Sequence, residues 1–307
     1  MLNWAYFTNT RVNQGNETKI ITAIFFFLIN HSFAITVDDL ETKSIFRTFY
    51  PSMFHAMFES KDEEEIKLPH IGIEENSQEY LAILHPAEVF KNNSGEDRYL
   101  IFVEKREIDK AVREIENGKL VEKSSNFYEF SEGCHACEGN ADLMIFKKNN
   151  QGNFDLVSKN INSYTPPSQY GIINLNIENL ASRIVKIGKN DVGFFDDSYT
   201  YSNDGGSDTL LHLIKLGDDA IQGYNIDIVE GSNEGSYDQN SPLNYSFKGE
   251  YRVNTDQPYL KSYPIEIKFK GDIYDEKTDK FVKYNKIKTY QFNNSKNTYS
   301  ITSEKSY

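Results

Sequence analysis

Short apolar runs separated by turn residues make up most of this chain from residue 70 onward. Residues 265–270 show the pattern most clearly, because they read Ile-Glu-Ile-Lys-Phe-Lys. A period of two places apolar side chains on one face of a strand and charged side chains on the other. The alternation therefore predicts an antiparallel sheet that has one face in solvent.

Further strands are predicted where β-branched and aromatic residues cluster between turn-forming residues. Residues 92–97 (Asn-Asn-Ser-Gly-Glu-Asp) and 149–152 (Asn-Asn-Gln-Gly) are turn sequences, and each is expected to form the loop of a hairpin. The predicted strands are residues 80–84, 98–108, 142–147, 154–159, 183–187, 192–195, 210–216, 224–229 and 281–292.

One segment has the helical period instead. Apolar residues recur at three- and four-residue intervals between Ile45 and Phe58, which puts them on one face of a helix. We expect residues 38–65 to form a helical cap on the β core, with Pro51 starting or kinking the helix. A second, short helix is expected over residues 109–117.

Residues 231–242 lack apolar periodicity and predict a linker or a long surface loop. They divide a main β-rich domain, residues 35–230, from a C-terminal antiparallel meander, residues 243–307. The meander is either a separate module or the closing strands of one fold. The expected class is mostly β: antiparallel sandwich or barrel-like sheets with a short N-terminal helical segment and a C-terminal meander.

The first 34 residues have the layout of a signal peptide. Lys19 precedes the apolar residues 20–29, and Ser32 and Ala34 follow at the spacing that signal peptidase recognises. The apolar run is too short to span a bilayer comfortably. We expect cleavage before Ile35, a mature chain without a membrane span, and a periplasmic or secreted location. Cleavage would remove Trp4, the sole tryptophan.

Composition narrows the range of partners. The chain is 14% aromatic and 26% charged, which is typical of a folded protein. Its 33 Lys and Arg against 46 Asp and Glu give a net charge of -13, which disfavours nucleic acid and anionic lipid. The charge favours a protein partner with a basic surface. The abundance of Asn, Lys and Tyr suggests an AT-rich bacterial genome.

The only two cysteines, Cys134 and Cys137, lie in the sequence Gly-Cys-His-Ala-Cys-Glu-Gly. In an exported protein this pair predicts a disulfide. Two alternatives stay open: a redox dithiol, and part of a zinc site completed by His135 or Glu138. The pair precedes a predicted strand rather than opening a helix, and this context favours the disulfide.

Seven aspartates lie between residues 191 and 219. Carboxylates grouped in a glycine-containing loop suit calcium, which takes six to eight oxygen ligands. The candidate ligands are Asp196, Asp197, Asp204 and Asp208, although their spacing is not that of an EF-hand. The alternative is an exposed acidic loop. No organic cofactor is predicted.

The sequence contains no nucleophile elbow, no His-Glu-x-x-His, no phosphate-binding loop and no dinucleotide-binding fingerprint. The leading hypothesis is therefore an exported bacterial binding protein that is not an enzyme. It would engage another protein or an envelope component through an acidic, Tyr-rich surface, as an inhibitor or immunity protein does. The alternative is an envelope thiol-disulfide or metal-dependent enzyme centred on Cys134 and Cys137.

Overall fold

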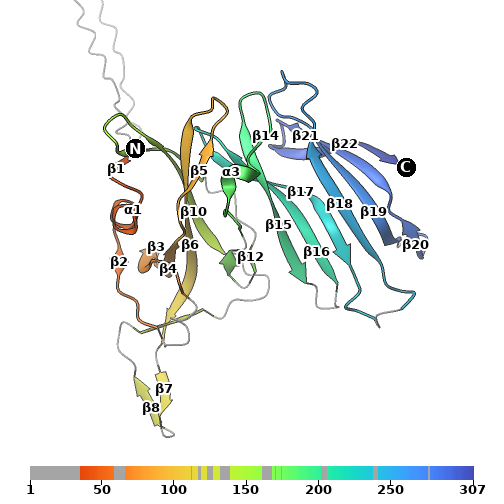
Figure 1. Ribbon diagram of the computed structural model, residues 1–307. Helices are drawn as coiled ribbons and strands as arrows, with labels where there is room; N and C mark the ends of the chain where they lie inside the picture. Colours follow the sequence, from red (N-terminus) through yellow and green to blue (C-terminus); the bar gives the residue numbers. More distant parts are fainter. Residues whose placement is uncertain are drawn as a thin grey trace, which may run out of the picture. The chain divides into compact units, whose positions relative to one another are not determined.

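Antiparallel strands dominate the computed structural model of this chain (Figure 1), with 58% of residues in strands and 5% in helices. The predicted fold class is therefore confirmed. The structure describes residues 35–58, 66–111, 113–116, 119–122, 127–131, 139–160, 168–169, 171–173, 175–201, 206–237, 241–275 and 277–307.

The first large sheet has the strand order β1-β11-β10-β6-β4-β3-β2, and β5 and β9 also pair with β6. All of its pairings are antiparallel. Its strands are β1 (Thr36–Val37), β2 (Met53–Phe54), β3 (His70–Glu75), β4 (Gln78–Leu84), β5 (Glu88–Lys91), β6 (Asp97–Lys110), β9 (Tyr128–Phe130), β10 (Asn140–Lys148) and β11 (Phe154–Lys159).

The second large sheet has the order β14-β15-β16-β17-β18-β19-β21-β22, and β20 pairs with β19. Its strands are β14 (Val185–Lys186), β15 (Val192–Tyr201), β16 (Ser207–Leu216), β17 (Ile221–Ser232), β18 (Ser246–Val253), β19 (Ile265–Asp275), β20 (Lys280–Lys283), β21 (Lys286–Asn293) and β22 (Thr298–Ser306). The smaller elements are the ribbons β7 (Arg113–Glu116) with β8 (Lys119–Glu122) and β12 (Ser168–Gln169) with β13 (Ile172–Ile173), and the helices α1 (Thr42–Phe49) and α3 (Leu180–Arg183).

The second sheet curls into a half-barrel. The pairing of β16 with β17 shifts register twice, and β17 then pairs with β18 over residues 230–232 alone. Such irregularities bend a strand and increase its twist. Lys288 and Tyr290 of β21 both donate hydrogen bonds to Asp227 of β17. These bonds link the two sides of the curled sheet.

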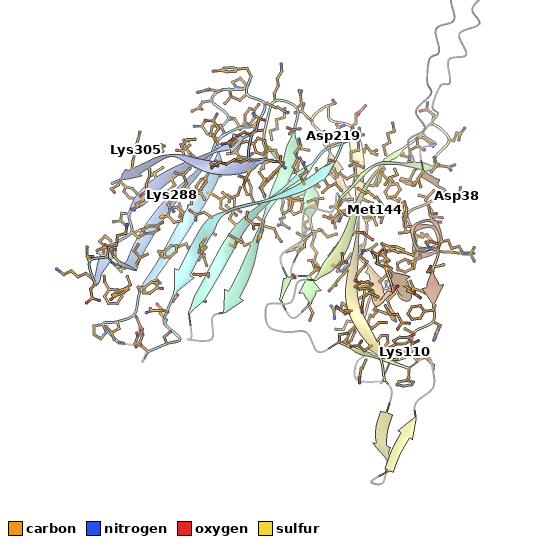
Figure 2. All side chains as sticks on the ribbon, turned by 180° about the vertical axis from the view of Figure 1, so that it is seen from behind. Asp38, Lys110, Met144, Asp219, Lys288 and Lys305 are labelled. Carbon is orange, nitrogen blue, oxygen red and sulfur yellow. The ribbon has the colours of Figure 1, made fainter. Side chains whose placement is uncertain are left out.

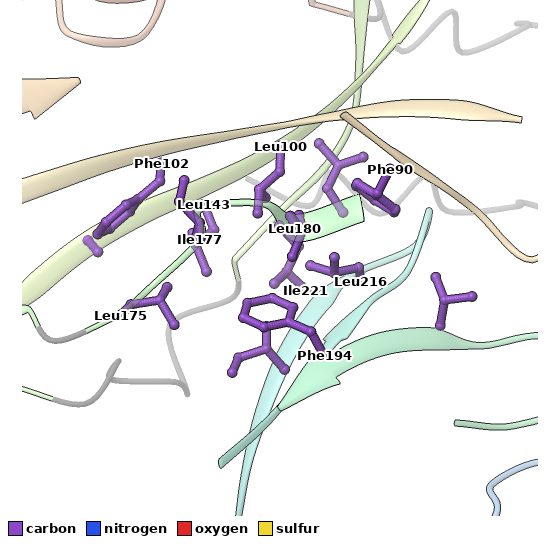
Figure 3. Close-up of a cluster of buried hydrophobic side chains, with 14 of the residues drawn as sticks. Phe90, Leu100, Phe102, Leu143, Leu175, Ile177, Leu180, Phe194, Leu216 and Ile221 are labelled. Carbon is purple, nitrogen blue, oxygen red and sulfur yellow. The ribbon is translucent and has the colours of Figure 1, made fainter. Parts of the chain in front are cut away.

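The central strands of the first sheet are buried on both faces. In β6, Leu100 and Phe102 belong to one hydrophobic core, whereas Ile101 and Val103 belong to another. The first core is shared with β15, β16 and β17 of the second sheet (Figure 3), and α3 contributes Leu180 to it. The second core is covered by α1. Because both faces are buried there, residues 99–103 of β6 form a continuous apolar run.

A third core fills the half-barrel. It is formed by apolar side chains from strands of the second sheet, and these alternate with polar side chains along each strand. Its buried members are Ile187, Phe195, Leu211, Leu213, Tyr224, Ile226, Val229, Ile265, Ile267, Phe269, Tyr290 and Tyr299. The predicted sheet with one solvent-exposed face is therefore present, and residues 265–270 form part of it.

The helix expected over residues 38–65 is wrong in its extent over residues 38–58, and residues 59–65 lie outside the described residues. Helix α1 ends at Phe49, because Pro51 has no N–H with which to continue the hydrogen-bonding pattern. The chain then forms β2, which pairs with β3. Phe54 and Phe58 pack on a small core with Leu81 and Ile83, so their spacing reflects tertiary packing and not a helix.

Two other local predictions are also corrected. Residues 113–116, expected in a helix, form β7, and β6 continues to Lys110. Of residues 183–187, expected as a strand, Arg183 ends α3 and only Val185 and Lys186 are in β14. Both predicted hairpin loops are confirmed, since β10 pairs with β11 and β6 pairs with β5. Strand β5, residues 88–91, was not itself predicted.

Residues 231–242 begin in β17 and lead into β18, its neighbour in the same sheet. The strands of residues 243–307 thus extend the second sheet. The division of the chain into 35–230 and 243–307 as domains stays a prediction. Among the described residues, no helix has the length and apolar character needed to cross a membrane.

Candidate functional site

The two cysteines singled out by the sequence, Cys134 and Cys137, lie outside the described residues. The description resumes at Gly139, which is buried and donates its backbone N–H to Ser168 Oγ at 2.8 Å. The chain that follows the pair is therefore fixed next to β12. The disulfide, the dithiol and the zinc site stay predictions.

Asp196, a predicted calcium ligand on β15, is a buried carboxylate with 6% of its surface exposed. Arg183 Nη2 donates to its Oδ1 at 2.8 Å, and the backbone N–H of Asn176 donates to its Oδ2 at 3.2 Å. Burial raises the pKa of Asp196 above its ordinary value, and these two donors oppose that rise. Because Arg183 ends α3, the ion pair ties this helix to β15.

The other acidic candidates lie apart from this ion pair. Asp197 follows Asp196 along β15, so its side chain lies on the opposite face of the strand. Asp208 of β16 is opposite Thr200, four residues further along β15. Asp204 lies outside the described residues. Within the described segments, no three His, Cys, Asp or Glu side chains are grouped closely enough to hold a metal ion, and the calcium site stays a prediction.

Sequence reasoning gave no role to His212, which lies opposite Asp196 in the pairing of β15 with β16. The side chain is buried. Burial lowers the pKa of His212, and a hydrogen bond with Asn225 opposes the change. The imidazole is therefore neutral at neutral pH. A single histidine within an apolar strand carries no further sequence signal.

A second buried network lies on the α1 side of the first sheet. Lys105 Nζ, almost inaccessible to solvent, donates to Glu75 at 2.9 Å and is 3.2 Å from Asp142 Oδ2. The Tyr50 hydroxyl donates to Asp142 at 2.7 Å. Burial opposes the charge of Lys105, but its two carboxylate partners together raise its pKa. These contacts join the end of α1 to β6, β3 and β10, which is a structural role.

Exposed apolar side chains are concentrated at the other end of the chain. Of the 14 large hydrophobic residues that are exposed in the described segments, ten lie between residues 228 and 307. All five exposed tyrosines are among them: Tyr237, Tyr251, Tyr259, Tyr274 and Tyr307. The most exposed is Tyr259, at 70%.

Two of these aromatic residues form a pair on the β19–β20 hairpin. Tyr274 and Phe281 are direct cross-strand partners with ring centroids 5.3 Å apart. Tyr245 lies 6.3 Å from Phe281, and Val282 beside it is also exposed. Val282 follows Phe281 along β20 and so points to the opposite face. The exposed group is therefore the pair Tyr274 and Phe281, and adjacent exposed aromatic side chains are more typical of a contact surface than scattered single residues.

The outer face of β18, β19, β21 and β22 is the side opposite the half-barrel core, and we call it the C-terminal face. Its cross-strand rows follow from the register of the sheet. Its members are Lys248, Glu250, Arg252, Glu266, Lys268, Lys270, Ile287, Thr289, Ser303 and Lys305. The register continues unshifted into β20, so Tyr274 and Phe281 extend this face.

The segment that carries the C-terminal face has a net charge opposite in sign to that of the whole chain. Residues 243–307 contain 12 Lys and Arg against 8 Asp and Glu, a net charge of +4, whereas the complete chain has -13. The predicted surface was acidic and Tyr-rich. The structure instead places four of the five exposed tyrosines on the part of the chain with a lysine excess.

Comparisons with known proteins give no relative: no protein family, no curated protein and no solved structure matches this chain.

Proposed function

We propose that this chain is an exported bacterial binding protein, not an enzyme, that engages another protein through the C-terminal face and its aromatic extension on β20. Export forms part of the proposal and rests on residues 1–34, with the disulfide of Cys134 and Cys137 as its expected companion. An intact-mass measurement showing that the mature protein begins at Ile35 would support export.

The observation that carries the binding role is the position of the exposed aromatic residues. Tyrosine offers a large, rigid contact area with two side-chain torsions and one polar group, so its burial against a partner costs little conformational entropy. Six other tyrosines among the described residues are buried, so exposure is selective: Tyr50, Tyr128, Tyr224, Tyr263, Tyr290 and Tyr299.

The strands that carry the exposed surface residues are linked to their neighbours by side-chain contacts. Arg252 of β18 donates from two guanidinium nitrogens to Glu266 of β19, at 2.8 and 2.6 Å. On the inner side, Lys288 lies 4.9 Å from the centre of the Phe269 ring and pairs with Asp227 at 2.8 Å. A rigid support lowers the cost of ordering a contact surface during binding.

The test is capture of a partner from periplasmic extract with matched surface variants. Tyr274→Ala/Phe281→Ala removes the aromatic pair, and Val89→Ala/Ile172→Ala removes two exposed apolar residues elsewhere. We expect the original chain and the control variant to retain the same protein, and the aromatic variant to retain at least tenfold less of it. Equal retention by both variants, or no retained protein at all, would contradict the proposal.

A further inference from the structure

We infer that Lys268, Lys270 and Lys305 on the C-terminal face bind a carboxylate-rich segment of the partner protein. The inference rests on the proposed function, and it gives the chemistry of the partner at this surface. It replaces a basic partner, expected from the net charge, with an acidic one.

The sheet register brings the three lysines together. Lys268 and Lys270 are two residues apart on β19 and share a face, a separation of about 7 Å along the strand. Lys305 lies in the same row as Lys268, with Ile287 of β21 between them. Two strand spacings give about 10 Å between those backbones. Figure 2 shows Lys305 on this outermost strand.

These lysines form no ion pair within the described structure, although Glu250 of β18 is the direct cross-strand partner of Lys268 and offsets part of the charge. None of the three has a carboxylate at ion-pairing distance among the described residues, whereas their neighbours do. Glu266 is paired with Arg252, and Lys248 is paired with Glu230. The C-terminal face thus carries five cationic side chains against two carboxylates, Glu250 and Glu266.

One pairing in this group works against stability. Lys248 and Lys270 are directly opposite each other on β18 and β19, and like charges at such positions repel. Glu230 already offsets part of the charge of Lys248. A carboxylate bound beside Lys270 would reduce the remaining repulsion.

Tyr307 completes the surface. Lys268 Nζ lies 4.9 Å from the centre of the Tyr307 ring, and the Tyr307 hydroxyl donates to the backbone oxygen of Phe269 at 2.9 Å. These contacts hold the ring on the face, yet 54% of the residue remains exposed. A partner segment would find an apolar contact beside the cations, as in typical protein interfaces.

The size of the lysine group favours an acidic protein segment over a long polyanion. A distance of about 10 Å corresponds to three residues of extended chain. Charges beyond about 8 Å are screened at physiological ionic strength, so a short segment responds to the local lysines. A nucleic acid or a long anionic polymer would extend past them toward the acidic remainder of the chain.

The experiment measures binding of a fluorescein-labelled octaglutamate peptide to the full chain by anisotropy. Lys268→Gln/Lys270→Gln/Lys305→Gln removes the cluster. The control Lys189→Gln/Lys277→Gln/Lys296→Gln makes the same charge change at exposed lysines outside the C-terminal face and β20. We expect at least tenfold weaker binding in the cluster variant, less than twofold in the control, and a steep decrease of affinity with salt.

Three results would overturn the inference: no peptide binding by the original chain, equal loss in both triple variants, or tighter binding of polyphosphate than of octaglutamate. If the cluster variant does not fold, the single change Lys305→Gln on the edge strand β22 decides, with at least threefold weaker binding expected. Partner capture that depends on Tyr274 and Phe281 but not on the lysines would contradict this inference and leave the proposed function intact.

Discussion

At the scale of single residues, His212 provides the clearest pH-dependent test. Burial places the folded pKa of this imidazole below its ordinary value of 6.5. The unfolded chain therefore binds more protons just below pH 6.5, and the free energy of unfolding decreases as the pH falls through that window. The slope for one proton is at most about 1.4 kcal/mol per pH unit.

Replacement of this histidine should flatten the pH dependence. We expect His212→Gln to reduce the decrease in unfolding free energy between about pH 6.5 and pH 5, measured by urea unfolding. His55→Gln, at an exposed position, is the control and should leave the slope unchanged. An unaltered slope in His212→Gln would show that the residue is not buried as described.

Lys105 and Lys110 test how burial changes the strength of an ion pair. Lys105→Met leaves Glu75 and Asp142 without their cation, and we expect a loss of about 2–4 kcal/mol of unfolding free energy. Lys110 on the same strand is exposed and 3.6 Å from Glu79, so Lys110→Met should cost less than about 1 kcal/mol. Equal losses in denaturant unfolding would contradict the difference in environment.

Among the strands, Gly271 allows β19 to lie close to β18 in the half-barrel. It has a φ of +147°, and an added Cβ would lie 2.3 Å from the backbone oxygen of Ser246 on β18. Gly95 also has a positive φ, +81°, but no atom lies near its missing Cβ. Strain at Gly271 therefore has a steric part that Gly95 lacks.

We expect Gly271→Ala to lower the free energy of unfolding by about 2–4 kcal/mol, and Gly95→Ala by about 1 kcal/mol. Chemical denaturation of the two variants measures the difference. A smaller loss at Gly271 than at Gly95 would show that β18 and β19 do not approach each other as described.

Local sequence signals correctly predicted the elements that are determined by neighbouring residues along the chain. The alternation in residues 265–270 and the turn sequences 92–97 and 149–152 correctly predict a strand and two hairpins. The helical period failed beyond Pro51, because Phe54 and Phe58 meet their neighbours through the tertiary fold. Spacing alone does not separate these two origins of an apolar pattern.

The candidate site was less accessible to sequence reasoning. Lys268 and Lys270 were visible as the polar half of an alternating strand, but Lys305 joins them only through the register of β19, β21 and β22. Net charge averaged over the whole chain also concealed the positive excess of residues 243–307. Long-range strand pairing, which no local pattern determines, assembles this surface.

At the scale of the whole molecule, the core shared by the two sheets should make them unfold together. Phe194 of β15 is fully buried there among side chains of β6 and β10. We expect Phe194→Ala to cost about 3–5 kcal/mol and to increase hydrogen exchange in both β10 and β16. Ile301→Ala, at an exposed position, should change neither. Faster exchange in β16 alone would mean that the sheets unfold independently.

We expect the C-terminal face to be the surface that contacts a partner. Site-specific photo-crosslinking in producing cells tests it most directly, with p-benzoylphenylalanine in place of Tyr307 or, as control, in place of exposed Ile172. We expect a discrete crosslinked protein from position 307 and none from position 172. A crosslinked product from position 172 alone, or none from position 307, would contradict it.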